Sequence, residues 1–263
     1  MFGIASPLIL LLFISMVPVE AVAQAVEARD GNIFFISRDG SRKQLTMLGL
    51  DSQPNLWSDG NRVVFVRRTP DLKIETGVPG PRGECCQIDN ELWIADVTGA
   101  KQPKRILSGH AGIYKIGPDL VLGGFQSPQF SVEGRIVFFE ANTWATDGAI
   151  YSLDLTSGFL RLICVGIGFQ VITEGKYKGY LIANKNMPNY PTHVHSYWLL
   201  DPVGKLLRQI GDGGQCALSR FKDQNGVRYV GVFQPNIQPP EIPAGISPCR
   251  SLPPTPCRKA ARP

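Results

Sequence analysis

The sequence of 263 residues is poor in the side chains from which most enzyme sites are built. It has three histidines and contains no G-x-S-x-G, H-E-x-x-H or Walker sequence. These absences exclude the nucleophile elbow of α/β hydrolases, a zincin-type zinc site and a P-loop nucleotide site. His193 and His195 would lie on one face of an extended segment, but no third ligand accompanies them. We therefore predict no catalytic, cofactor or metal site.

Charge is missing from the first residues. Met1 to Val19 holds no charged side chain and includes the apolar run LILLLFISMV, which small residues follow up to Ala25. This pattern predicts a secretory signal peptide over residues 1–25, cleaved after Ala23 or Ala25. An uncleaved anchor is the alternative, although crossing a bilayer takes about 20 apolar residues. We expect a periplasmic or secreted protein with no membrane span after cleavage.

The sequence lacks C-x-x-C, yet it has six cysteines, all after the predicted signal peptide. An even number of cysteines in an exported chain is typical of disulfides. Adjacent Cys85 and Cys86 are too close to pair with each other, so they are expected to have different partners. Cys249 and Cys257 bracket a short proline-rich segment and form the best local pair. The disulfide candidates are therefore Cys85, Cys86, Cys164, Cys216, Cys249 and Cys257, with a metal or redox use of the adjacent pair as the alternative.

A strong surplus of positive charge is absent from the middle of the chain. The net charge is +5, and it becomes +6 when Glu20 leaves with the signal peptide. The stretch from Cys249 onward supplies +4 of this through Arg250, Arg258, Lys259 and Arg262, which leaves +2 for the rest. We therefore predict no basic stripe and no nucleic-acid partner. The proline-rich basic tail, residues 237–263, is expected to be extended, either as a solvated terminus or as a partner-docking segment.

What the sequence does contain is a repeated hairpin pattern. Asp39-Gly40 and Asp59-Gly60 each lie between runs of strand-forming residues, and Asp-Gly supplies the positive φ of tight hairpin turns. The pattern returns along the chain, so we count four modules, each of four strands. They start near Ile33, Leu92, Ile150 and Tyr197. In the last module, Cys216 to Phe233 is predicted to form two strands joined by a turn at Asn225-Gly226.

The order of these signals over Ile33 to Arg68 carries a family resemblance. A hydrophobic strand, Asp-Gly, a strand ending in Leu45-Thr46, Asp51-Ser52-Gln53-Pro54 and Ser58-Asp59-Gly60 follow one another. This order resembles the β-propeller repeat of TolB-like periplasmic proteins. The resemblance implies an all-β fold over residues 26–236, a β-propeller of four-stranded antiparallel blades, with at least four and up to six blades. A β-sandwich is the alternative fold, and ring closure stays open.

The functional expectation rests on this resemblance and on the absence of enzyme motifs. We expect an exported binding or scaffold protein whose propeller loops meet a protein or peptide of the bacterial cell envelope. A metal-dependent, lactonase-like hydrolase with an axial-channel site is the alternative. Trp144 is predicted to be an exposed contact, whereas Trp57, Trp93 and Trp198 are predicted to pack in the core. Asp51, Ser52 and Gln53 are expected to fix a loop between strands through hydrogen bonds from side chain to backbone.

Overall fold

The computed structural model describes the greater part of the chain. The described residues are 23–69, 90–109, 123–142, 148–166, 168–186, 195–211 and 215–229. They form β1 (Ala25–Arg29), β2 (Asn32–Ile36), β3 (Arg42–Gln44), β4 (Asp51–Leu56), β5 (Arg62–Arg68), β6 (Asn90–Asp96), β7 (Lys104–Ser108), β8 (Gly123–Phe130), β9 (Ile136–Asn142), β10 (Gly148–Asp154), β11 (Leu160–Val165), β12 (Phe169–Glu174), β13 (Leu181–Asn186), β14 (His195–Leu200), β15 (Leu206–Gly211), α1 (Gln215–Asn225) and β16 (Arg228–Tyr229).

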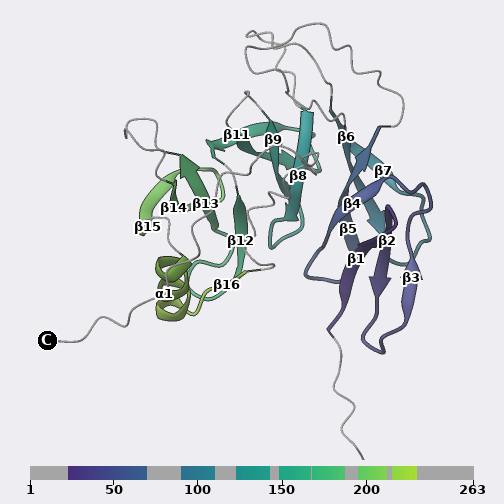
Figure 1. The fold of residues 1–263 in the computed structure, drawn as a ribbon, viewed down its shortest axis with the longest axis horizontal. Helices are drawn as coiled ribbons and strands as arrows, with labels where there is room; N and C mark the ends of the chain where they lie inside the picture. The colour runs from purple at the N-terminus through teal and green to yellow at the C-terminus, as the bar shows by residue number, and fades with distance from the viewer. Residues whose placement is uncertain are drawn as a thin grey trace, which may run out of the picture.

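The strands make four consecutive antiparallel sheets, so the fold is an all-β propeller. Blade 1 contains β1–β3, blade 2 contains β4–β7, and blade 3 contains β8–β11. Blade 4 contains β12–β15, with the short β16 beside β12. Figure 1 shows the blades following one another in an arc, with β4, β8 and β12 on its inner side and β3, β7, β11 and β15 toward its outside. The prediction of at least four blades is confirmed, and the sandwich alternative is wrong.

The core lies between the blades and explains the composition of the middle strands. Val63 to Val66 of β5 are all buried, because this strand is covered by a neighbouring blade on each side. A strand buried on both faces needs a continuous apolar run rather than alternation. Each of the three pairs of successive blades shares one cluster, and Phe65, Phe139 and Leu181 are fully buried members of these clusters. Burial of these side chains is what holds one blade to the next.

The predicted boundaries between modules are wrong by half a blade. The module predicted from Ile33 combines β2 and β3 of blade 1 with β4 and β5 of blade 2. The sequence repeat is periodic, so it does not say which strand of four begins a sheet. β5 and β6 pair within blade 2, although residues 70–89 separate them in the sequence. The true boundary lies in the short connection between β3 and β4.

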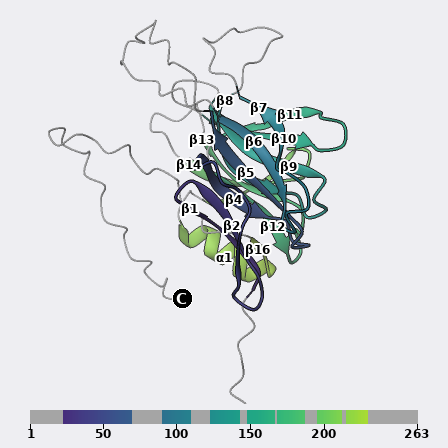
Figure 2. The same ribbon diagram turned by 90° about the vertical axis from the view of Figure 1, so that its right-hand side faces the viewer.

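The end of the last module also differs from the prediction. Cys216 to Asn225 belongs to a helix, α1, rather than to a strand. Leu218 and Phe221 recur at helical spacing and pack against blade 4 together with Val227. Gly226, predicted as a hairpin turn, instead follows the helix at a φ of 58°, the left-handed conformation common just after helix ends. Within the described residues, the face of blade 4 opposite blade 3 is therefore covered by α1 (Figures 1 and 2).

Among the described residues, no helix combines the length and the apolar character needed to cross a bilayer.

Candidate functional site

The inner strands of blades 2 and 3 share a local irregularity that shapes the inner side of the arc. Gln53 and Ser127 occupy equivalent positions before Pro54 and Pro128, and each has a φ of 51°. The pairing of β4 with β5 shifts register at this point, and the pairing of β8 with β9 does the same. Such a bulge bends its strand and redirects the side chains that follow. Asn55 and Gln129 are thereby presented to the next blade.

Side-chain amides connect the inner strands of successive blades. The Oε1 of Gln53 accepts a 2.6 Å hydrogen bond from the backbone N–H of Ser127. The Oδ1 of Asn55 accepts one of 3.2 Å from the N–H of Phe130. The Oε1 of Gln129 accepts one of 3.0 Å from the N–H of Val171, and its Nε2 donates to the carbonyl of β12 at 3.0 Å. We call this set the amide ladder.

The amide ladder refines the expectation for Asp51, Ser52 and Gln53. Gln53 does bond to backbone, but it reaches the next blade instead of fixing a loop in its own. Asp51 pairs with Arg67 of β5 through two bonds of 2.6 and 2.8 Å, and both side chains are buried. The guanidinium of Arg67 also lies 4.1 Å from the ring centroid of Trp93. The start of the inner strand is thus a structural anchor.

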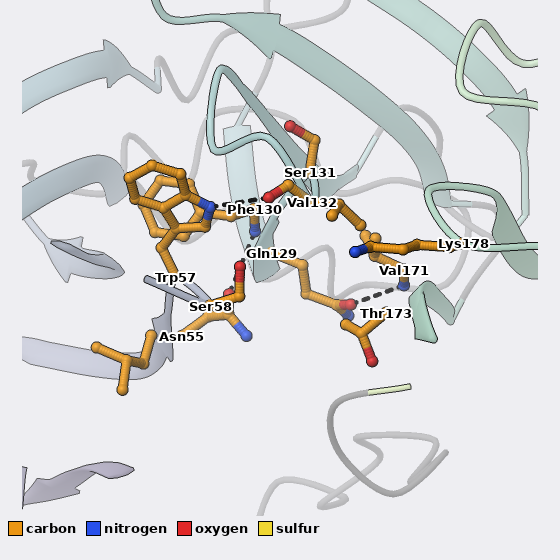
Figure 3. Close-up of a pocket in the computed structure, with 11 residues that line it drawn as sticks. Asn55, Trp57, Ser58, Gln129, Phe130, Ser131, Val132, Val171, Thr173 and Lys178 are labelled. Atoms are coloured by element: carbon orange, nitrogen blue, oxygen red, sulfur yellow. Dashed lines mark hydrogen bonds between the residues drawn. The ribbon is translucent and has the colours of Figure 1, made fainter. Parts of the chain in front are cut away.

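A pocket opens where the inner strands of three blades meet their following hairpins. Its cavity volume is about 110 Å³, and Figure 3 shows the side chains around it. Blade 2 contributes β4 and its turn, blade 3 contributes β8 and its turn, and blade 4 contributes β12 and the β12–β13 connection. The lining residues are Asn55, Leu56, Trp57, Ser58, Gln129, Phe130, Ser131, Val132, Val171, Thr173 and Lys178.

Trp57 forms a fixed wall of this pocket. Its indole Nε1 donates a 3.1 Å hydrogen bond to the carbonyl of Val132 in blade 3. The Arg62 guanidinium lies over the indole ring, 4.1 Å from its centroid, and donates to the carbonyl of Gly134 at 2.9 Å. Gly134 itself lies against the indole ring. Trp57 was predicted as a core residue, and it is half-buried at the border of two blades with an edge toward the pocket.

The pocket has apolar walls, and the charged residue among those that line it is Lys178. Lys178 is exposed, and Figure 3 shows its ammonium directed toward Val132. Within the described part of the chain, Lys178 forms no ion pair. The Oγ of Ser131 is taken by the N–H of Ile136 at 3.1 Å, whereas Ser58 is exposed at the rim. A group that carries a carboxylate on an apolar stem could therefore bind here, with the carboxylate beside Lys178 and the stem against the apolar walls.

Glu140 is a carboxyl group held inside blade 3, on β9. Burial raises its pKa, while hydrogen bonds from the backbone of Gly168 and the side chain of Ser127 act in the opposite direction. It is not among the residues that line the pocket. Across the described ranges, no three or more His, Cys, Asp or Glu side chains gather in a way that could hold a metal ion.

Most residues considered from the sequence as contacts, metal ligands or disulfide partners lie outside the described residues. These are Trp144, His193, Cys85, Cys86, Cys249 and Cys257. Cys216 and His195 lie in α1 and β14, but their side chains are also outside the description. Cys164 of β11 is a buried free thiol, and burial raises its pKa to about 11. The predicted pairings of the cysteines and the contact role of Trp144 stay predictions.

Sequence reasoning did not find Lys178 or the amide ladder. The positions of Asn55 and Gln129 could have been recognised, because each follows the proline of a repeat and precedes an apolar residue. Lys178 offered no signal, since it lies in an irregular connection whose course depends on the fold.

Comparisons with known proteins give weak likenesses. No family model and no curated protein matches the chain. The β-propeller domain of the Trilobed protease from Pyrococcus furiosus is 12% identical, with a TM-score of 0.42 over 68% of this chain and 48% of that one. Puromycin hydrolase is 15% identical, with a TM-score of 0.43 over 69% and 27%. TolB from Acinetobacter baumannii is 15% identical, with a TM-score of 0.29 over 66% and 47%. The chain thus spans less than half of the length of each of these structures.

Proposed function

We propose that the chain is a TolB-like, exported binding module that holds a segment of a partner protein in the pocket between blades 2, 3 and 4. The partner belongs to the bacterial cell envelope, and the protein works in the periplasm or outside the cell. The observation that carries the proposal is the joining of apolar walls, one unpaired cation and a rigid frame at the inner side of three blades. The role is to bind and present, not to catalyse.

The size of the pocket favours a side chain over a free small molecule. Sites for small molecules and cofactors usually enclose roughly 300–1,000 Å³. A cavity of about 110 Å³ has room for one side chain. The rest of a bound segment would lie across the neighbouring turns, where Ser58 is exposed. Such an arrangement is a protein–protein contact in which one side chain of the partner is inserted into the pocket.

The frame of the pocket is suited to binding without rearrangement. The amide ladder and the bond from Trp57 to the carbonyl of Val132 fix the walls before any partner arrives. Preorganised walls lower the conformational entropy that binding must overcome. Tryptophan is also enriched among the residues that dominate the binding energy of protein interfaces. Among the residues of the pocket, Trp57 is therefore expected to contribute most to the binding energy.

The charge in the pocket specifies the chemistry of the inserted group. The Lys178 ammonium faces apolar side chains and is not neutralised by a described acid. An acidic side chain, or a chain terminus with its carboxylate, would pair with Lys178 while its stem contacts Phe130 and Val171. Charge complementarity of this kind also speeds association and disfavours wrong partners.

Site-specific photo-crosslinking tests the proposal. A photoreactive phenylalanine analogue replaces Ser58 at the pocket rim, and in a matched control it replaces Ser219, which is also exposed and lies on α1. In envelope extract, we expect a defined adduct from position 58 that Trp57→Ala and Lys178→Glu both abolish. The same adducts from both positions, or none from position 58, would contradict the proposal. Stoichiometric calcium or zinc in the purified protein would instead favour the hydrolase alternative.

A further inference from the structure

The outer strands of blades 3 and 4 and the turns before them expose apolar side chains that no other described element covers. The large apolar residues exposed there are Phe159, Leu162, Val165, Val203, Leu206 and Leu207. Phe159 and Val203 are each 59% exposed. Large apolar side chains exposed together on a protein surface are typical of an interaction surface.

These side chains belong to one continuous region. They come from β11, from β15 and from the turns that precede these strands. The turn before β15 touches β11, because Gly204 packs against the backbone and side chain of Ile163. We call β11, β15 and the turns before them, residues 155–159 and 201–205, the outer rim.

Charge is segregated on the outer strands of all four blades. β3, β7, β11 and β15 contain Arg42, Lys43, Lys104, Arg105, Arg161 and Arg208, and they contain no Asp or Glu. Acids of the same blade partly neutralise these strands, because Arg42 pairs with Glu27 at 3.4 Å and Arg105 with Glu91 at 2.7 Å. The prediction of no basic stripe across the propeller stays a prediction, and the cations of blades 3 and 4 are the ones that matter here.

The cations of the outer rim are not neutralised by acids in the described residues. Arg161, Lys205 and Arg208 form no ion pair there. Arg161 instead lies over the ring of Phe159, 5.7 Å from its centroid, so the charge and the apolar group are presented together.

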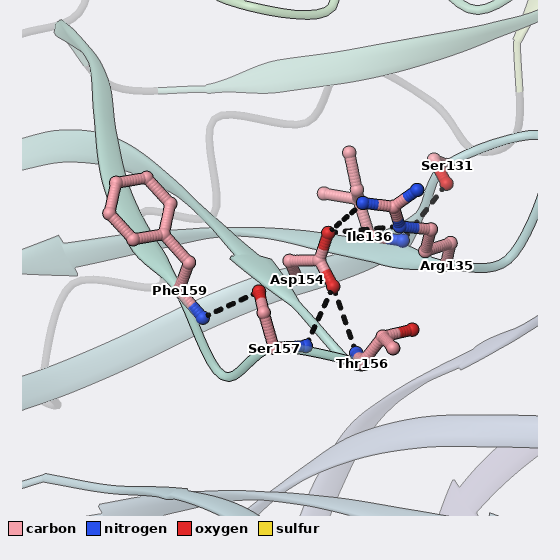
Figure 4. A network of polar contacts seen from close by, with 7 residues as sticks. All are labelled: Ser131, Arg135, Ile136, Asp154, Thr156, Ser157 and Phe159. Atoms are coloured by element: carbon pink, nitrogen blue, oxygen red, sulfur yellow. Dashed lines mark hydrogen bonds and ion pairs between the residues drawn. The ribbon is translucent and has the colours of Figure 1, made fainter.

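The acids nearest to the outer rim are already engaged. Asp154, the last residue of β10, accepts from the backbone N–H groups of Thr156 and Ser157 and pairs with Arg135 at 2.6 Å (Figure 4). These contacts, first of all the hydrogen bonds from Arg135, hold the pKa of Asp154 far below its usual range. Asp201 likewise accepts from the N–H groups of Val203 and Lys205. Both carboxylates stabilise their turns and do not pair with Arg161 or Lys205, whereas Arg208 lies over the rings of Tyr177 and Phe221 at 5.7 and 5.1 Å from their centroids.

We infer that the outer rim docks on an anionic lipid surface. A bilayer interface satisfies both kinds of side chain at once, because its phosphates attract Arg and Lys while its acyl region takes up Phe, Leu and Val. The pocket lies on the inner side of the same blades, so docking through the rim would leave it open to a partner. An acidic protein could use the cations, but it would have to supply an apolar face of matching extent.

Vesicle sedimentation tests this inference with the full chain. The vesicles contain either equal parts of phosphatidylglycerol and phosphatidylcholine or phosphatidylcholine alone. We expect binding to the first kind only, weakening as salt rises. Each cation near an anionic surface strengthens binding by a similar factor. The double variant Arg161→Gln/Lys205→Gln, which loses two of them, should therefore bind roughly 30-fold more weakly.

Two further variants make the test specific to the outer rim. Arg29→Gln/Arg68→Gln removes the same charge from exposed positions elsewhere, retains the basic tail, and should bind like the unaltered protein. Leu162→Gln/Val203→Gln keeps the charge but should bind about tenfold or more weakly, because it removes apolar insertion. Thermal unfolding verifies that each variant is folded. Absence of binding to anionic vesicles at low salt, or equal losses in the two charge variants, would overturn the inference. Binding to polyglutamate without binding to vesicles would also overturn it and would identify an acidic protein surface instead.

Discussion

The packing between blades 2 and 3 can be tested by adding one methyl group at Gly134. Gly134 has a φ of 66°, and a Cβ added there would lie 2.5 Å from the Cδ2 of Trp57 and closer still to two other ring atoms. Gly158 has a similar φ of 73°, yet a Cβ there would meet nothing within 4 Å. The two glycines therefore differ in packing and not in backbone conformation.

The expected magnitudes follow from that difference. An alanine in the left-handed region costs about 1–2 kcal/mol, and this is all that Gly158→Ala should lose. Gly134→Ala should lose about 1–3 kcal/mol more, because the indole ring must move or the turn must shift. The total for Gly134→Ala is then about 2–5 kcal/mol. In a Trp57→Ala background the excess should vanish, so that the two substitutions cost the same.

Urea denaturation followed by circular dichroism measures these free energies of unfolding. The slopes with denaturant must agree among the variants for the values to be compared. Equal losses for Gly134→Ala and Gly158→Ala would refute the packing of Trp57 against blade 3. An excess that persists without Trp57 would refute the assignment of the clash to the indole ring. Either result would also remove the wall on which the proposed pocket depends.

The buried pair of Asp51 and Arg67 should be costly to break: Arg67→Met is expected to lose about 3–5 kcal/mol in urea denaturation. Removing the cation of the exposed pair formed by Arg105 should cost only about 0–1 kcal/mol, and similar losses would contradict the burial argument. Gln129→Leu should lose about 2–4 kcal/mol and speed hydrogen exchange in β12, since it leaves two backbone groups of that strand unpaired. Cys164 makes stability depend on alkaline pH. Because the pKa of its thiol is raised from 9.0 to about 11 in the folded state, its contribution is full below pH 9 and is lost as the pH rises toward 11. Cys164→Ala should lessen this decline in a series of thermal unfolding curves, and an unchanged pH profile would count against the buried thiol.

Local signals in the sequence were sufficient to predict the hairpins but not to predict which strands belong to the same blade. Asp59-Gly60 and Val203-Gly204 mark turns because positive φ is a property of one or two residues. The boundaries between blades depend on which strands share a sheet, and that is decided by packing across the whole array. The helix α1 was missed for the same reason. Its apolar residues fit a short strand as well as a helix until blade 4 offers a face to cover.

The site and the outer rim were hidden from sequence reasoning in different ways. Trp57 was assigned correctly to packing, but a repeat does not reveal which packed residue also borders a cavity. The role of Gln129 depends on a neighbour 42 positions away, Val171, which no local pattern indicates. The basic outer strands were lost in a sum over the whole propeller. A sum of charges strand by strand would have recovered them, because Arg161 and Arg208 occupy matching positions in successive modules.

The amide ladder has a direction, because each contact runs from a side chain of one blade to the backbone of the blade after it. The protection of Ser127 and Phe130 amide protons thus depends on the integrity of blade 2, and that of Val171 on blade 3. Coupling through these bonds is reciprocal, because each bond is lost when either partner moves. Local opening of blade 3 should therefore expose the amide protons of Ser127, Phe130 and Val171, whereas opening of blade 2 should expose only the first two of these.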